Sequence, residues 1–272
     1  MDSDTLTRRA PIRLGDCGAF GLTDAGRVRR ENQDRFLIDA ALNLVAVADG
    51  VGGHAFGARA SATALECIAE KLAAYAMPGG SIDATRACDP DATVHDACAC
   101  AMRTAADALD HANATLHAMN LRERLAPRSM GTTLTGIWQP RSSGSLVALH
   151  IGDSRLYRYR DGKLAQLSRD QTLYQQALEN GAIEHLPPRN VLLQALGPLP
   201  SIAPVVETHA WLPGDRYLLC SDGLHGEVPH GEIEAVLAEV TSRGIEAACG
   251  RLVALALDAG GRDNVTVVIA CF

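Results

Sequence analysis

The stretch Leu44-Val45-Ala46-Val47-Ala48-Asp49-Gly50-Val51-Gly52-Gly53-His54 joins an apolar run to an aspartate and a group of glycines. The apolar run predicts a buried strand, and Asp-Gly predicts a turn where that strand ends. A carboxylate at the mouth of a buried strand is costly unless something compensates its charge. Asp49 therefore marks either a plain turn or a functional site.

The same arrangement recurs along the chain, always with an aspartate at the edge of a strand-like run. The further cases are Asp34 before Arg35–Ile38, Asp153 after Leu146–Gly152, Asp222 after Tyr217–Ser221, and Asp263 before Val265–Ile269. Taken singly, each aspartate could serve as a cap or a turn residue. Five together predict a shared site where carboxylate oxygens bind divalent cations.

Bulk composition sets limits on the function. The chain has 272 residues, of which 47% are hydrophobic and 21% charged, as in soluble globular proteins. The net charge of −7 argues against a nucleic-acid partner. No apolar stretch is long enough to span a membrane, and residues 1–9 do not resemble a signal peptide, so we expect a cytoplasmic protein without membrane association. The eight cysteines form no Cys-x-x-Cys pair, and a zinc site is not expected.

Hydrophobic spacing predicts two consecutive long helices. The first begins near His54 and ends before Pro78, and a loop at 79–90 separates it from the second, which runs from Val94 to Met119. The spacing of the second also matches a coiled coil, but an Ala-rich helix packed on a sheet is favoured.

Strand patterns follow the two helices. The segment 132–167 reads as strands, with Asp161-Gly162 as a hairpin turn. The remaining predicted elements are a helix at 171–180, an irregular Pro-rich stretch at 186–204, helices at 231–240 and 243–258, and a strand at 265–271. Helix pairs between runs of strands argue against a parallel sheet and predict an α+β fold with antiparallel sheets. No linker or repeat interrupts residues 1–272, so a single domain is expected.

Several local motifs, in this order, resemble the PPM family, the metal-dependent protein serine/threonine phosphatases of the 2C class, in their bacterial form. The motifs are Thr23–Asp34, Ala48–His54, Met130–Leu134, Ile151–Arg155, Cys220–Leu224 and Gly261–Asn264. The resemblance extends from about Gly21 to Phe272. It implies a four-layer α/β/β/α sandwich of two antiparallel sheets flanked by helix pairs.

The resemblance also implies a role for each site residue. Two Mg²⁺ or Mn²⁺ ions and a third, weaker one are expected, and Arg29 is expected to bind the substrate phosphate. Asp49 would bridge two ions and Gly50 would offer its carbonyl. The other expected metal ligands are Asp222 and Asp263 on one ion, Asp34 as an outer ligand of the other, and Asp153 on the third. Arg29, Asp49 and Asp222 are the expected catalytic residues.

The chemistry explains these residue types. Hydroxide that attacks a phosphate dianion meets repulsion, which two metal ions can screen while lowering the pKa of a bridging water. The Arg29 guanidinium is a planar fork suited to two phosphate oxygens. Val51 stands where some members have a histidine acid, so the leaving group would take its proton from a metal-bound water or from His54. Gln33 stands where Glu is frequent.

The resemblance implies hydrolysis of phosphoserine and phosphothreonine in proteins, with a serine/threonine kinase as a partner. Residues 168–197 match the family's flap, a cover beside the active site. One alternative is a phosphatase of a single regulator in a sigma-factor switch, but such relatives usually lack the flap. A second is a phosphoprotein-binding pseudophosphatase, which would lack metal ligands. A small-molecule phosphatase is a third.

Overall fold

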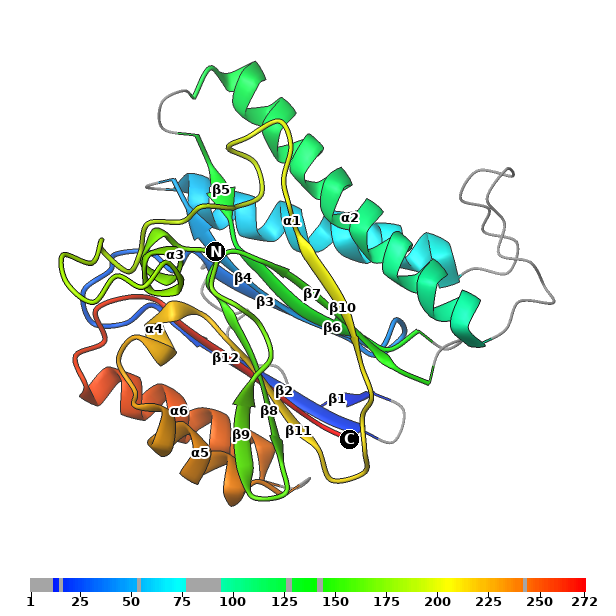
Figure 1. Cartoon of the computed structure of the whole chain (residues 1–272), viewed down its shortest axis with the longest axis vertical. Coiled ribbons are helices and arrows are strands. Elements are labelled where there is room, and N and C mark those ends of the chain that lie inside the picture. Colours follow the sequence, from blue (N-terminus) through cyan, green and yellow to red (C-terminus); the bar gives the residue numbers. More distant parts are fainter. Residues whose placement is uncertain are drawn as a thin grey trace, which may run out of the picture.

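Two antiparallel sheets face each other, with helices on the outer side of each (Figure 1). This arrangement is seen in a computed structural model, which describes residues 12–14, 17–52, 55–76, 94–125, 129–140, 144–241 and 244–272. All strand pairs in the described residues are antiparallel. The predicted α+β sandwich is confirmed.

The first sheet has the strand order β1-β2-β12-β11-β8-β9. Its strands are β1 (Ile12–Leu14), β2 (Cys17–Asp24), β8 (Arg155–Arg160), β9 (Lys163–Gln166), β11 (Arg216–Cys220) and β12 (Val265–Cys271). The second sheet has the order β10-β7-β6-β4-β3, and a short β5 pairs with β4. Its strands are β3 (Asp34–Asp39), β4 (Leu44–Val51), β5 (Gly131–Thr132), β6 (Leu134–Trp138), β7 (Leu146–Ile151) and β10 (Val205–His209).

Two long helices, α1 (Ala55–Ala76) and α2 (Val94–Glu123), cover the second sheet. The first sheet is covered by α4 (Asp222–His225), α5 (His230–Ala238) and α6 (Ile245–Asp258). The short helix α3 (Leu173–Glu179) lies in the segment between β9 and β10. The predicted loop at 79–90 lies outside the described residues.

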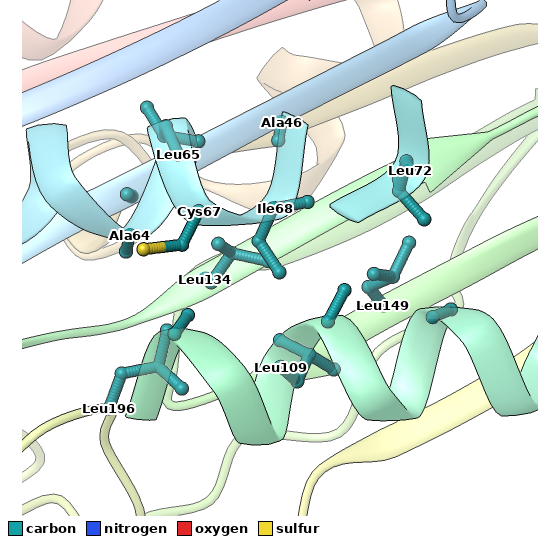
Figure 2. Packing of buried hydrophobic residues seen from close by; sticks show 14 of the residues in the cluster. Ala46, Ala64, Leu65, Cys67, Ile68, Leu72, Leu109, Leu134, Leu149 and Leu196 are labelled. Atoms are coloured by element: carbon teal, nitrogen blue, oxygen red, sulfur yellow. The ribbon is translucent and has the colours of Figure 1, made fainter. Parts of the chain in front are cut away.

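Three hydrophobic cores hold these layers together, one between the sheets and one under each helix layer. Figure 2 shows the core under α1 and α2, where Ile68 and Leu109 meet side chains of the second sheet. The α2 helix therefore packs on a sheet and is not a coiled coil. Leu196 also lies in this core and is fully buried, so the end of the 168–197 segment is anchored there.

The predicted hairpin at Asp161-Gly162 is confirmed. Both residues have positive φ, 50° and 78°, as a two-residue turn of this type requires. Three strands were not predicted, β1, β2 and β10. The β10 strand is partly exposed at a sheet edge, and its pairing with β7 gives it its conformation.

Candidate active site

One cavity of about 490 Å³ lies where strand β4 of the second sheet meets the ends of β11 and β12 of the first sheet. The predicted site residues that line it are Arg29, Asp49, Gly50, Asp153, Asp222 and Asp263. The remaining one, Asp34, begins β3 directly opposite Asp49 on β4 and is completely buried. The structure therefore brings all seven predicted residues together, although they come from five separate motifs of the chain.

The carboxylates in this cavity oppose one another's ionisation. Burial, with the charge of Asp153 added, raises the pKa of Asp222 to about 8. Burial and the charges of Asp34 and Asp222 hold the pKa of Asp49 well above its usual value. Burial also raises the pKa values of Asp34 and Asp153 to about 6. Because these carboxyl groups are buried close together, bound cations would strongly stabilise their deprotonated forms.

Two buried carboxylate oxygens in the described part of the chain have no hydrogen-bond partner, Oδ1 of Asp34 and Oδ1 of Asp222. Buried polar atoms normally have partners, so each unpaired oxygen needs an explanation. Carboxylate oxygens of this kind suit Mg²⁺ or Mn²⁺. Within the described ranges, no three Asp, Glu, His or Cys side chains already converge on one point. These oxygen ligands therefore suit hard cations, although the described carboxylates do not converge on a single ion position.

A set of hydroxyl groups fixes the other oxygen of Asp34. Ser221 Oγ and Thr266 Oγ1 each donate to Asp34 Oδ2, both at 2.7 Å. Thr23 Oγ1 lies 2.7 Å from Thr266 Oγ1 and accepts a hydrogen bond from Asn32. With Oδ2 fully engaged, Asp34 presents only Oδ1 for any further ligand.

Arg29 lies at the cavity, but its guanidinium is already paired. Its Nη2 lies 2.6 Å from Asp263 Oδ2, and 56% of the arginine side chain is exposed. The guanidinium thus compensates one of the clustered carboxylates. Because a guanidinium has five N–H groups, it could bind an incoming anion beside Asp263 or after turning away from it.

Asn264 has a structural role that the sequence pattern did not reveal. Its Oδ1 accepts from the Gln33 main-chain N–H at 2.8 Å, and its Nδ2 donates to the carbonyls of Ala25 and Glu31. It therefore holds the loop that carries Arg29. The Asp-Asn pair in the sequence was the only signal available, and it pointed to Asp263 alone.

His117 corrects a sequence interpretation. The helical spacing of His117, like that of His111, predicts a solvated side chain. His111 is exposed, but His117 is half-buried and its Nδ1 lies 3.1 Å from the carbonyl of Gly197. The difference arises because the end of the 168–197 segment lies against α2. The alternative proton donor His54 falls outside the described residues.

Comparison with known proteins identifies the family and agrees with the fold. Residues 26–248 match the family model described as Protein phosphatase 2C, so the chain belongs to that family. It is 30% identical over 262 residues to the protein phosphatase PhpP of Streptococcus pneumoniae, covering 91% of this chain and 94% of PhpP. It is also 34% identical over 253 residues to the serine/threonine protein phosphatase PstP of Mycobacterium tuberculosis.

The PstP match covers 91% of this chain but only 43% of PstP, so the chain spans less than half of that relative. A crystal structure of the PstP catalytic domain in complex with two manganese ions is similar in fold. It has a TM-score of 0.74 at 32% identity and covers 94% of this chain and 97% of the other.

Proposed function

We propose that this protein is a metal-dependent protein serine/threonine phosphatase that uses a metal-activated water. The observation that carries the proposal is the cavity itself, which four aspartates and Arg29 line, with a fifth aspartate, Asp34, buried behind Asp49. Asp34 and Asp222 each have one buried oxygen without a hydrogen-bond partner. Membership of the Protein phosphatase 2C family supports it. We further propose that residues 1–272 act as one domain, because both sheets contribute to the same cavity.

The proposed residue roles follow from position. Asp49 would bridge two Mg²⁺ or Mn²⁺ ions, with Asp222 and Asp263 on one of them. Asp34 lies behind Asp49 with one free oxygen, which suits an outer ligand of the other ion. Asp153 would help to hold a third ion, and Gly50 would offer its carbonyl. The first turn of α1 packs so closely on Gly50 that a side chain there would meet the carbonyl of Gly57.

Bound ions would supply an activated water and neutralise phosphate charge. The protein's own part is to position groups. Arg29 would bind the substrate phosphate, beside Asp263 or in place of it. The serines beside the aspartates are not available as nucleophiles. Ser221 donates to Asp34, and Ser154 shares a 2.7 Å hydrogen bond with Thr133, and both serines are fully buried.

Phosphorylated proteins are the proposed substrates, as the names of the relatives suggest. A serine/threonine kinase that modifies the same targets is the proposed partner, and the cytoplasm is the proposed location. Among the described helices, none combines the length and apolarity that a membrane crossing requires. The intact set of five aspartates is the reason for preferring an enzyme to a pseudophosphatase.

The function is tested by hydrolysis of a phosphothreonine peptide with Mn²⁺ and with a chelator, using the native chain and Arg29→Ala. We expect metal-dependent turnover by the native chain. In Arg29→Ala we expect kcat/KM to fall about 10- to 100-fold, chiefly through KM, because a charge-assisted hydrogen bond to phosphate contributes about 1.5–3 kcal/mol. Arg27→Ala, in the same loop but outside the cavity lining, is the matched control. Turnover that is unaffected by the chelator would contradict the proposal.

The hydroxyls around Asp34 give a second prediction. We expect Ser221→Ala and Thr266→Val each to raise the Mn²⁺ concentration needed for half-maximal activity by about tenfold, as is usual when an outer partner of a metal ligand is lost. The measurement is a Mn²⁺ titration with p-nitrophenyl phosphate as substrate. Thr104→Val removes a buried hydroxyl from α2, where it bonds to the Cys100 carbonyl, and should leave the titration unchanged.

A further inference from the structure

Three consecutive residues at the start of the 168–197 segment, the flap segment, are fixed to the turn that carries Asp153. Arg155 makes a two-pronged ion pair with Asp170, with Nε···Oδ1 at 2.9 Å and Nη2···Oδ2 at 2.7 Å. His150 Nε2 lies 2.9 Å from the carbonyl of Arg169. The root of the flap segment therefore moves only if this turn moves.

Gln171 forms the closest connection, because it binds both main-chain groups of Gly152. Its N–H donates to the Gly152 carbonyl at 2.8 Å, and its Oε1 accepts from the Gly152 N–H at 2.9 Å. Gln171 is almost wholly buried, so water cannot easily replace these bonds. The position of Gly152 is thus set by the flap root.

Gly152 in turn rests directly on Thr133. A Cβ placed on Gly152 would approach Thr133 Cγ2 to 2.6 Å, and Gly152 has φ of +104°, so only glycine suits this contact. The Thr133 hydroxyl also lies 2.7 Å from Ser154 Oγ, on the other side of Asp153. Thr133 therefore contacts the residues on both sides of that aspartate.

Thr133 is bonded to Asp49 as well. Its N–H donates to the Asp49 carbonyl at 2.9 Å, and its Oγ1 accepts from the Asp49 N–H at 3.0 Å. It is 1% exposed and its side chain borders the cavity. Thr133 thus contacts two parts of the site. One is the main chain of Asp49, which would bridge two ions, and the other is the turn at Gly152, which Gln171 holds.

We infer that Thr133 is a positioning residue that couples the root of the flap segment, through Gln171 and Gly152, to Asp49, so that metal affinity depends on how the flap root is seated. This inference rests on the proposed metal site. The Thr133 hydroxyl orients Asp49, and the Gly152 contact transmits the position of Gln171. The chain of contacts contains no charged side chain, so neutral substitutions can test it without altering the electrostatics of the cavity.

The test is a double-mutant cycle on the full chain, with Mn²⁺ binding measured by titration calorimetry. Thr133→Val removes the hydroxyl with little change of shape, and we expect the Kd for Mn²⁺ to rise about tenfold. Gln171→Met removes the bond to Gly152 N–H, and we expect a rise of about threefold or more. The double variant should bind no more weakly than Thr133→Val alone, because the path from Gln171 is already broken there.

Two controls separate positioning from general structural damage. Thr133→Ser keeps the hydroxyl and should retain native affinity, and Thr104→Val loses a buried hydroxyl elsewhere and should do the same. Additive effects in the double variant would overturn the inference. If Thr133→Val does not fold, an unchanged Kd in Gln171→Met would overturn it. Absence of Mn²⁺ binding by the native chain would instead contradict the proposed function.

Discussion

Asp49→Asn is expected to abolish phosphatase activity and, in the presence of a chelator, to make the protein harder to unfold. Activity should fall by more than about a hundredfold, because losing merely an outer partner of a metal ligand already costs about 10- to 100-fold. Stability should rise because Asp49 faces Asp34 and Asp222, and burial with their charges raises its pKa well above the usual value. The amide keeps the shape of the side chain and removes the repulsion.

The measurement is a thermal melt of both proteins with chelator at pH 7.5, beside an activity assay with Mn²⁺. We expect Tm to rise by several degrees, since about 1 kcal/mol corresponds to about 2–4 °C in a chain of this size. Asp110→Asn, on the exposed face of α2, is the control and should change neither quantity. A variant that is inactive but also less stable without metal would mean that Asp49 has a structural partner and is not repelled by its neighbours.

The second large effect is a reversal of the pH dependence of stability by metal. Four of the clustered carboxyls have a folded pKa above the unfolded value: Asp34, Asp49, Asp153 and Asp222. The folded state therefore holds more protons, and stability falls as pH rises towards each folded pKa. Asp34 and Asp153, with pKa values of about 6, lower the stability as the pH rises from about 4 to 6. Asp222 continues to lower it up to its pKa of about 8.

Buried histidines oppose this trend at lower pH. Burial lowers the pKa of His225 to about 4 and also lowers that of His150, so these groups add stability as pH rises to their unfolded pKa of about 6.5. The carboxyl effect is therefore clearest between about pH 6.5 and 8. In chelator, we expect Tm to fall across this window.

Saturating Mn²⁺ should raise Tm and reverse the slope, because binding requires the deprotonated carboxylates. At a hundred times Kd, one site adds about 2.7 kcal/mol, which corresponds to about 5–10 °C. The measurement is a series of melts from pH 6.5 to 8 with chelator and with Mn²⁺. Asp49→Asn should show a shallower slope in chelator than the native chain. A native Tm that rises with pH in chelator would contradict the assignment of these carboxyls.

Local sequence patterns accounted for the aspartates but not for their partners. Asp49 could be predicted because a strand pattern ends at Asp-Gly, and the hairpin at Asp161-Gly162 because few residues adopt positive φ readily. The hydroxyls on Asp34 could not be predicted, because Ser221 and Thr266 lie 187 and 232 residues away along the chain. No periodicity within one strand indicates which distant carboxylate a serine will meet.

The same limit explains the missed β10 and the misread His117. No residue of β10 is fully buried, so its sequence shows no clear alternation of apolar and polar residues, and the strand depends on its pairing with β7. The burial of the His117 side chain depends on the segment near Gly197, which lies against α2. In each case a contact with a distant part of the chain determines the local structure, and local residue propensity does not indicate that contact.

The flap segment is attached to the rest of the protein near both of its ends. At one end Gln171 binds Gly152, and at the other the Gly197 N–H donates to Asn113 at 2.8 Å, with Leu196 buried beside it. Between them, α3 has no buried residue and Ile183 is 88% exposed. We therefore expect a relative's sequence to be tolerated in place of the exposed part of this segment, between the two attachments, with the rest of the fold retained.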